Sequence, residues 1–206
     1  MEKVTNIVSL ILISFLMSLI IGSRLIKVLN SKHASQRLSI YLEQRHKTKK
    51  NTPTMGGLIF SISLFLIILI LYLFNKITIT YNLIIVLFTF FSYSLIGFID
   101  DFLIIKRNNN KGLSEWCKLV LQIIVAIFFF YLFISAGNET LIWIHSLNIK
   151  VNISWYYGLF ILFVLVASSN AVNITDGLDG LAGGLCLIAF LPFGIITYNT
   201  TWLLGY

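Results

Sequence analysis

The sequence predicts an all-α membrane protein with six transmembrane helices, and three observations support this fold class. First, 58% of the 206 residues are hydrophobic and the mean hydropathy is +0.91, which is unusual for a soluble domain. Second, only 8 Asp or Glu and 15 Lys or Arg interrupt the apolar sequence. Third, the apolar residues form continuous blocks such as 64–73, and this excludes the alternating pattern of a porin-like barrel.

Six stretches without any Asp, Glu, Lys or Arg define the expected helices in order. Each has at least 20 residues, and a helix of about 20 residues spans a hydrocarbon core of roughly 30 Å. We interpret the first stretch as a membrane helix, because its apolar run is too long for a cleaved signal and Gly22-Ser23-Arg24 is a poor cleavage site. All six belong to one expected domain, 1–206. The stretches are 4–23, 51–75, 77–99, 119–138, 151–175 and 180–206.

The distribution of Lys and Arg predicts how these helices are oriented. Twelve of the 15 basic residues lie in the loops after the first and third helices, and such loops remain in the cytoplasm. We therefore expect the N-terminus outside, both basic loops inside, and the turn between the fifth and sixth helices inside as well. This bias accounts for most of the net charge of +7, so we expect no nucleic-acid partner.

Two neighbouring acids, Asp100 and Asp101, close the third apolar stretch. They repel each other, and the C-terminal end of a helix, where we expect them, disfavours negative charge. A solvated helix end balanced by Lys106 and Arg107 is one interpretation. We favour a role in binding a cation or a phosphate, because ionisable residues at a membrane boundary often belong to functional sites.

A second acidic group, Asp176 and Asp179, occurs at the next cytoplasmic boundary. If this segment is helical, Asn173 shares one face with both acids. If it is a turn, Gly177 and Gly180 permit positive φ. In either case polar groups converge, and we expect the two acidic groups of the chain to meet at the inner surface of the membrane.

A third element is the segment 52–57, Thr-Pro-Thr-Met-Gly-Gly, which follows a basic run at 47–50. Its hydroxyls and glycine backbone are suited to a phosphate or a nucleoside, and Gly56-Gly57 is equally suited to close helix packing. Because the acids occur without a cluster of Cys or His, they favour Mg2+. Carboxylates, lysines and an apolar wall together suit phosphoryl transfer to a lipid.

These motifs resemble those of the polyprenyl-phosphate N-acetylhexosamine-1-phosphate transferases, in the same order and at similar spacing. The resemblance rests on residues 52–57, 97–101, 111–114 and 170–182. The form of segment 52–57 is similar to the branch of the family whose donor is UDP-N-acetylmuramoyl-pentapeptide.

The resemblance implies that undecaprenyl phosphate attacks the β-phosphorus of this donor, UMP leaves, and lipid I forms for peptidoglycan synthesis. It implies Mg2+ as cofactor, contact with membrane lipids, and a multi-pass location in the bacterial cytoplasmic membrane. Asp100, Asp101, Asp176 and Asn173 would belong to the catalytic centre, and the three aspartates are the candidate metal ligands. The substrate-binding residues implied are Lys49, Thr54, Gly177, Leu178, Asp179 and His46.

The chain departs from the family pattern in three places, and the first is that the stretch 39–46 lacks the Gly-Pro that is common before His46. The family motif Asp-Asp-x-x-Lys has Ile104 at its last position here, and the third aspartate motif and the His-rich loop of the family do not occur. We therefore expect the chain to be the N-terminal part of a longer domain and to be inactive in isolation. A transferase for UDP-N-acetylglucosamine and a non-catalytic membrane scaffold remain alternatives, and a homodimer is left open.

Overall fold

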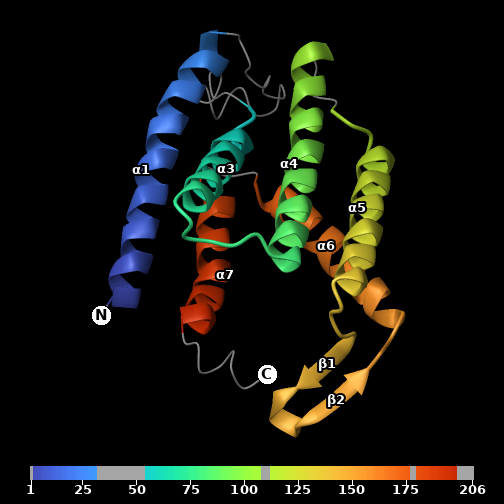
Figure 1. The fold of residues 1–206 in the computed structure, drawn as a ribbon. Helices are drawn as coiled ribbons and strands as arrows, with labels where there is room; N and C mark the ends of the chain where they lie inside the picture. The colour runs from blue at the N-terminus through green and yellow to red at the C-terminus, as the bar shows by residue number, and fades with distance from the viewer. Residues whose placement is uncertain (1, 32–53, 108–111, 177–179, 199–206) are drawn as a thin grey trace. The chain divides into compact units, whose positions relative to one another are not determined.

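The computed structural model describes residues 2–31, 54–107, 112–176 and 180–198 (Figure 1). These residues form six α-helices, and each overlaps one of the six apolar stretches, which confirms the predicted helical fold. The helices are α1 (Glu2–Ser31), α3 (Gly57–Leu73), α4 (Tyr81–Arg107), α5 (Glu115–Ser135), α6 (Tyr156–Thr175) and α7 (Leu181–Tyr198).

Four of the described helices are long and apolar enough to cross a membrane. They comprise Val8–Ser31, Tyr81–Arg107, Glu115–Ser135 and Tyr156–Thr175, whereas the apolar helices Gly57–Leu73 and Leu181–Ile196 are shorter. At 17 residues, α3 extends about 25 Å, somewhat less than a hydrocarbon core of roughly 30 Å. It ends before Asn75, whose φ of 53° is incompatible with a continuing helix.

A β-hairpin follows α5, and the sequence analysis did not predict it. Strand β1 (Leu141–Ile144) pairs antiparallel with β2 (Ile149–Asn152), with Trp143 opposite Lys150. The Lys150 ammonium lies 4.3 Å from the centre of the Trp143 ring. The six helices agree with the all-α class, and the short hairpin is an addition to it. Its strands contain β-branched and aromatic residues, which favour strands: Ile142, Trp143, Ile144, Ile149 and Val151.

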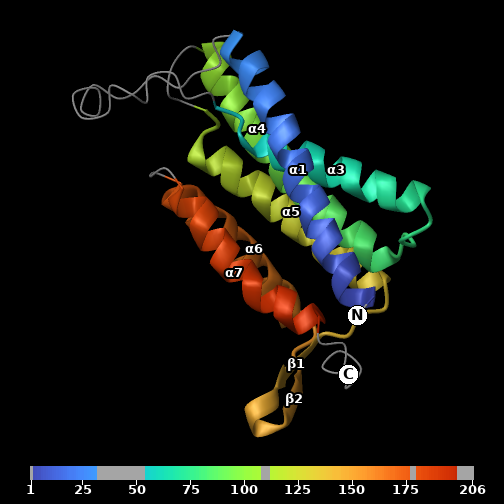
Figure 2. The same ribbon diagram turned by 90° about the vertical axis from the view of Figure 1, so that its left-hand side faces the viewer.

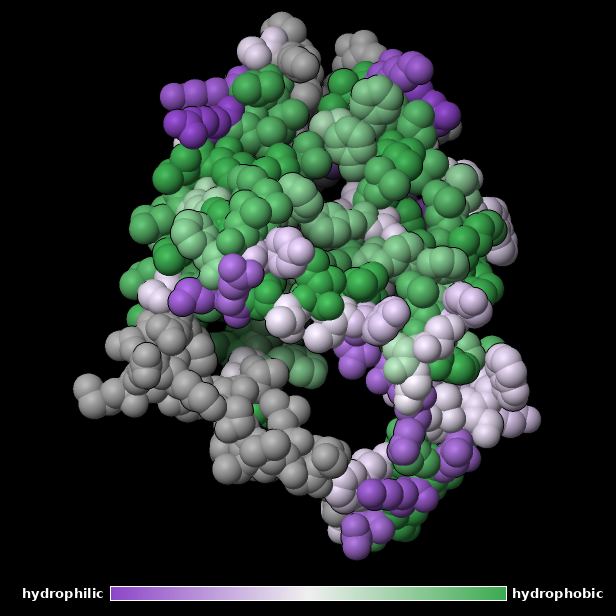
Figure 3. Space-filling view, in the orientation of Figure 1, coloured by the Kyte–Doolittle hydropathy of each residue, from purple (hydrophilic) through white to green (hydrophobic). Residues whose placement is uncertain are grey.

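The chain divides into two compact units, residues 1–154 and 155–206, which we describe separately. In the first unit α1 contacts α3, α3 contacts α4, and α4 contacts α5 (Figure 2). In the second unit α6 contacts α7. Many large apolar side chains of the helices are exposed, and on the face drawn in Figure 3 they cover most of the helix surface. Such a surface suits lipid better than water.

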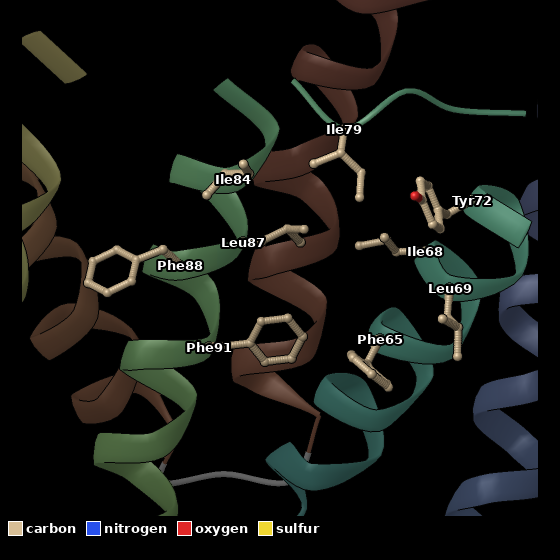
Figure 4. Close-up of a pocket in the computed structure, with 9 residues that line it drawn as sticks. All are labelled: Phe65, Ile68, Leu69, Tyr72, Ile79, Ile84, Leu87, Phe88 and Phe91. Carbon is tan, nitrogen blue, oxygen red and sulfur yellow. The ribbon is translucent and has the colours of Figure 1, made fainter. Parts of the chain in front are cut away.

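An apolar cavity of about 430 Å³ lies between α3 and α4 (Figure 4). It is lined by aromatic and aliphatic side chains that include Phe65, Phe91 and Tyr72. Its lining on α4 comes from residues 84–91, in the half of that helix remote from the two aspartates.

Helix α4 continues for six residues beyond Asp101, to Arg107. The expectation that the helix ends at the two aspartates is therefore wrong. Lys106 and Arg107 occupy the last turn, where positive charge interacts favourably with the helix dipole. The aspartates thus lie on the side of a continuous helix, and this decides which loops they contact.

Candidate functional site

The carboxylate of Asp100 joins α4 to the start of α5. Its Oδ2 lies 2.7 Å from the Nζ of Lys118, and its Oδ1 accepts a hydrogen bond of 2.7 Å from the backbone N–H of Leu113. The side chains of Lys118 and Asp100 are only 20% and 18% exposed. Because water screens such a pair less than one at an open surface, the contact fixes the geometry of both groups.

The carboxylate of Asp101 instead joins α4 to the start of α3. Its Oδ2 accepts a hydrogen bond of 2.8 Å from the backbone N–H of Met55. Met55 has a φ of 68°, and the left-handed conformation costs a residue with a side chain roughly 1–2 kcal/mol. A hydrogen bond to a charged group contributes about 1.5–3 kcal/mol, enough to offset this strain. The Met55 side chain is also buried, beside Leu29.

The two neighbouring aspartates thus contact different loops because of helix geometry. Successive side chains on an α-helix point about 100° apart, so Asp100 turns to the loop before α5 and Asp101 to the loop before α3. The face of Asp101 also carries Ser94, seven residues earlier, whose Oγ accepts a hydrogen bond of 3.1 Å from Ser61 of α3. Asp100 and Asp101 are therefore neighbours in the sequence but contact different segments of the chain.

Gly112 occupies a position where a side chain has no room. A Cβ atom placed there would overlap the Asp100 carboxylate and would lie 3.0 Å from its backbone oxygen. The carbonyl oxygen of Gly112 accepts a hydrogen bond of 3.1 Å from the Nη1 of Arg107. This glycine allows the loop before α5 to approach α4 closely enough for the contacts of Asp100.

Thr54 precedes Met55. Of the predicted substrate-binding residues in the first unit, Thr54 is the one that lies in a described part of the chain. Its Oγ1 is buried and has no hydrogen-bond partner among the described residues. A buried hydroxyl without a partner is costly in a folded protein. The Thr54 hydroxyl is therefore available to a ligand group, and it lies one residue from the backbone N–H that Asp101 binds.

Asn173 and Asp176 lie at the end of α6 in the second unit. Asn173 is in the last turn and Asp176 is the C-cap residue, whose backbone N–H donates to the Val172 carbonyl over 3.1 Å. The helix ends there and Gly180 has a φ of 80°. Asp179 and its two preceding residues lie outside the described parts of the chain, so both the turn and the helical face that includes Asp179 stay predictions.

The remaining predicted site residues lie outside the described parts of the chain. They are His46, Lys49, Gly177, Leu178 and Asp179.

The described residues supply some of the oxygen donors that Mg2+ requires. Asp100 and Asp101 have the right chemistry, since Mg2+ binds carboxylate oxygens. Within the described ranges, however, no three His, Cys, Asp or Glu side chains gather as a metal-binding group, and Asp100 is already paired with Lys118. These residues alone therefore do not form a complete magnesium site.

The sequence assigned no individual role to Lys118, Met55 or Gly112, although Met55 and Gly112 lie in the motifs 52–57 and 111–114. Lys118 lies in the first turns of α5, which begins after Ser114; the Ser114 hydroxyl accepts a hydrogen bond of 3.2 Å from the Cys117 N–H. This N-cap pattern in the sequence could have located the start of α5. Ile104 occupies the position of the lysine in the family motif. A basic side chain that pairs with Asp100 therefore had to be sought elsewhere, and the start of the next helix supplies it in Lys118.

Two family models match this chain. Glycosyl transferase family 4 matches residues 83–205, and phospho-N-acetylmuramoyl-pentapeptide-transferase signature 1 matches residues 49–60. The second match includes Thr54 and Met55, and the first includes both aspartates of α4.

Similar curated proteins carry the name phospho-N-acetylmuramoyl-pentapeptide-transferase. The protein of Oceanobacillus iheyensis is 35% identical over 194 residues, which cover 94% of this chain and 60% of the relative. That of Staphylococcus carnosus is 40% identical over 192 residues, 92% of this chain and 59% of the relative. The chain thus spans about 60% of the length of these relatives.

Proposed function

Because this chain belongs to glycosyl transferase family 4, we propose that its protein transfers phospho-N-acetylmuramoyl-pentapeptide from the UDP donor to undecaprenyl phosphate. The products are lipid I and UMP. The signature at residues 49–60 and the names of the relatives support this donor. The apolar helices support a multi-pass location in the bacterial cytoplasmic membrane, in contact with its lipids.

The observation that carries the proposal is a pair of carboxylates on α4, each of which binds the backbone of a different loop. Asp100 accepts a hydrogen bond from the loop before α5, and Asp101 accepts one from the segment before α3. Asp100 would accept the proton of the lipid phosphate, and Lys118, at 2.7 Å from it, would attract the phosphate oxygens. Lys118 thereby supplies the positive charge that Ile104 lacks.

Further residues are proposed for the same reaction. Asp176 and Asn173 belong with Asp100 and Asp101 in the catalytic centre, and the orphan hydroxyl of Thr54 binds the nucleotide-sugar. The other substrate-binding residues proposed are His46, Lys49, Gly177, Leu178 and Asp179.

Mg2+ is the proposed cofactor, with Asp100, Asp101 and Asp176 as candidate ligands beside ligands from the rest of the protein. When bound, it would neutralise charge on the pyrophosphate of the donor. We expect EDTA to abolish transfer by the whole protein and Mg2+ to restore it.

The test measures UMP release by the whole protein in membranes, with the muramoyl-pentapeptide donor and with UDP-N-acetylglucosamine. We expect the first donor to be used and the second to be rejected; the opposite preference would favour the related transferase. Changing Asp100, Asp101 or Asp176 to Asn is expected to reduce turnover by about a hundredfold or more, with unchanged insertion into membranes. Near-normal turnover in all three variants would refute the site assignment.

The 206 residues alone are proposed to be inactive, because they span about 60% of the length of the relatives. UMP release by this chain alone would contradict that. A non-catalytic scaffold, suggested by Ile104, predicts that the whole protein is inactive as well. The ion pair between Lys118 and Asp100 favours the enzyme, since it retains a lysine beside the first aspartate.

A further inference from the structure

We propose that the apolar cavity between α3 and α4 binds one anionic phospholipid from the membrane leaflet opposite the aspartates, with an acyl chain in the cavity and the lipid phosphate beside Lys76. This site is separate from the proposed transfer reaction and uses none of the residues assigned to it. Three observations carry the proposal: the lining of the cavity, the end at which the two helices touch, and the charge near the other end.

The cavity offers an acyl chain an apolar environment of sufficient size. Its volume is about 430 Å³, within the range of roughly 300–1,000 Å³ that is usual for small-molecule sites. Of the nine lining side chains only Tyr72 carries a polar atom, and water does not fill a cavity that lacks polar partners. Phe65, Ile79 and Ile84 are about half exposed, so the cavity opens to the surroundings of the helices, which in a membrane are lipid chains.

The two helices touch at the end of the cavity that is nearer to the aspartates. There the rings of Phe65 and Phe91 meet edge to face, with 6.3 Å between their centres, and Figure 4 shows this pair at the opposite end from Ile79. One turn further on, the hydroxyl of Ser61 donates a hydrogen bond of 3.1 Å to Ser94. A lipid anchored by its phosphate near the aspartates would meet this closed end, whereas a lipid of the opposite leaflet reaches the cavity from the Ile79 end.

Lys76 supplies a positive charge at the end of α3 that lies away from the aspartates. In the turn that ends α3, Asn75 has a φ of 53° and the Lys76 N–H donates to the Leu71 carbonyl over 2.8 Å, which fixes the Lys76 backbone. Tyr72 and Ile79, on either side of Lys76 in the chain, both line the cavity. The Lys76 side chain is exposed and forms no ion pair within the described ranges, so its ammonium is available to a lipid phosphate.

Helix α3 is short for a membrane span, and this brings Lys76 within reach of a headgroup. Its 17 residues extend about 25 Å, against a hydrocarbon core of roughly 30 Å. If α3 starts at one surface, its end therefore lies slightly below the headgroups of the other. A lysine side chain at such a depth extends toward the phosphates. The phosphate and one chain of the same lipid would thus be held by neighbouring parts of one segment.

Native mass spectrometry of the whole protein in detergent tests the charge, with phosphatidylglycerol as the anionic probe and phosphatidylethanolamine as the zwitterionic one. We expect one phosphatidylglycerol to bind more tightly than phosphatidylethanolamine. Lys76→Gln should weaken phosphatidylglycerol binding by about fivefold, the effect of one lysine near an anionic surface. Lys150→Gln is the matched control, because Lys150 stands over the Trp143 ring and does not line the cavity. Equal losses in both variants, or no loss in Lys76→Gln, would overturn the proposal.

Leu87→Trp tests the cavity, because it places a larger side chain in the space for the acyl chain. We expect it to weaken phosphatidylglycerol binding by about tenfold or more, since the excluded methylenes lose their contacts with apolar side chains. Leu95→Trp is the same change on α4 at a position that is 56% exposed and outside the cavity lining, and it should leave binding unchanged. Equal binding by Leu87→Trp and wild type would show that another part of the whole protein covers the cavity, and the proposal would be wrong.

Undecaprenyl phosphate is the competing lipid for this cavity. Added in excess, it should leave the bound phosphatidylglycerol in place. If it displaces phosphatidylglycerol from wild type and itself binds less tightly to Leu87→Trp, the cavity holds the acceptor chain and the proposal is wrong.

Thermal unfolding gives a second measurement that does not depend on transfer activity, so it stands even if the proposed function fails. A ligand of the folded state stabilises that state by mass action. Phosphatidylglycerol should therefore raise the Tm of wild type and Leu95→Trp more than that of Lys76→Gln or Leu87→Trp. The same rise in all four proteins, or no rise in wild type, would overturn the proposal.

Discussion

Gly112 offers a sharp test of how the loop before α5 meets α4. In Gly112→Ala the new Cβ would lie 2.9 Å from the Asp100 Cγ and 3.0 Å from its backbone oxygen, and contacts this short between non-bonded atoms require a shift. The backbone oxygen belongs to a helix, and Lys118 and Leu113 hold the carboxylate. The loop must therefore move away from α4.

The expected cost follows from the contacts that this movement breaks. Loss of the hydrogen bond from Leu113 to the Asp100 carboxylate corresponds to about 1.5–3 kcal/mol, which is roughly a 10- to 100-fold loss of turnover if the site requires this geometry. The backbone of Gly112 is not left-handed, so the loss comes from space and not from φ. The assay is UMP release by the whole protein, with thermal unfolding measured on the same samples.

Gly97→Ala is the matched control on α4. No described atom lies within 4 Å of a Cβ at Gly97, and Ala is favoured over Gly in a helix by about 0.5–1 kcal/mol. We expect turnover close to wild type and stability equal or slightly higher. If Gly112→Ala behaves like Gly97→Ala in both measurements, the close approach of the loop does not matter and the reasoning is refuted.

Three further predictions concern α5 and its ends. Lys118→Met should lower transfer by about tenfold or more, because it leaves a largely buried carboxylate without its cation. Adding Ile104→Lys, one turn from Asp100, to this variant should restore part of the activity. No restoration would show that a lysine at position 104 cannot replace Lys118. Ser114→Ala removes the N-cap of α5 and should lower the free energy of unfolding by about 1 kcal/mol, as measured by denaturant titration, so an unchanged value would contradict the cap. In a variant that retains only the exposed Cys117, an impermeant maleimide should not label intact cells, whereas Glu139→Cys in a cysteine-free background should be labelled; the reverse pattern would contradict the predicted orientation.

Much of the fold could be predicted because the relevant property is local. A block of 20 or more apolar residues without charge can satisfy its backbone in lipid only as a helix, and all six blocks contain helices. The bounds were less accurate: α4 runs to Arg107 although charges begin at Asp100. The hydropathy pattern changes at the first charged residue, whereas the helix continues to the residue at which its backbone hydrogen bonds end.

The hairpin was missed because strand pairing is not a local property. Residues 141–150 lie between two apolar stretches and end on Lys150, and residues 151–152 belong to the next stretch, so a search for uncharged blocks could not identify the hairpin. Each strand has only four residues, and its backbone groups are satisfied by the partner strand. The left-handed Asn148 lies between the strands, and Asn is among the residues that adopt this conformation most readily.

From the sequence alone one could name the acids, the segment 52–57 and the membrane character, because residue types and their hydropathy are written there directly. Only the tertiary structure decided that Asp100 meets Lys118 while Asp101 meets Met55. The reason is geometric: neighbours on a helix point about 100° apart, and the loops that approach each face come from segments 13 and 46 residues away.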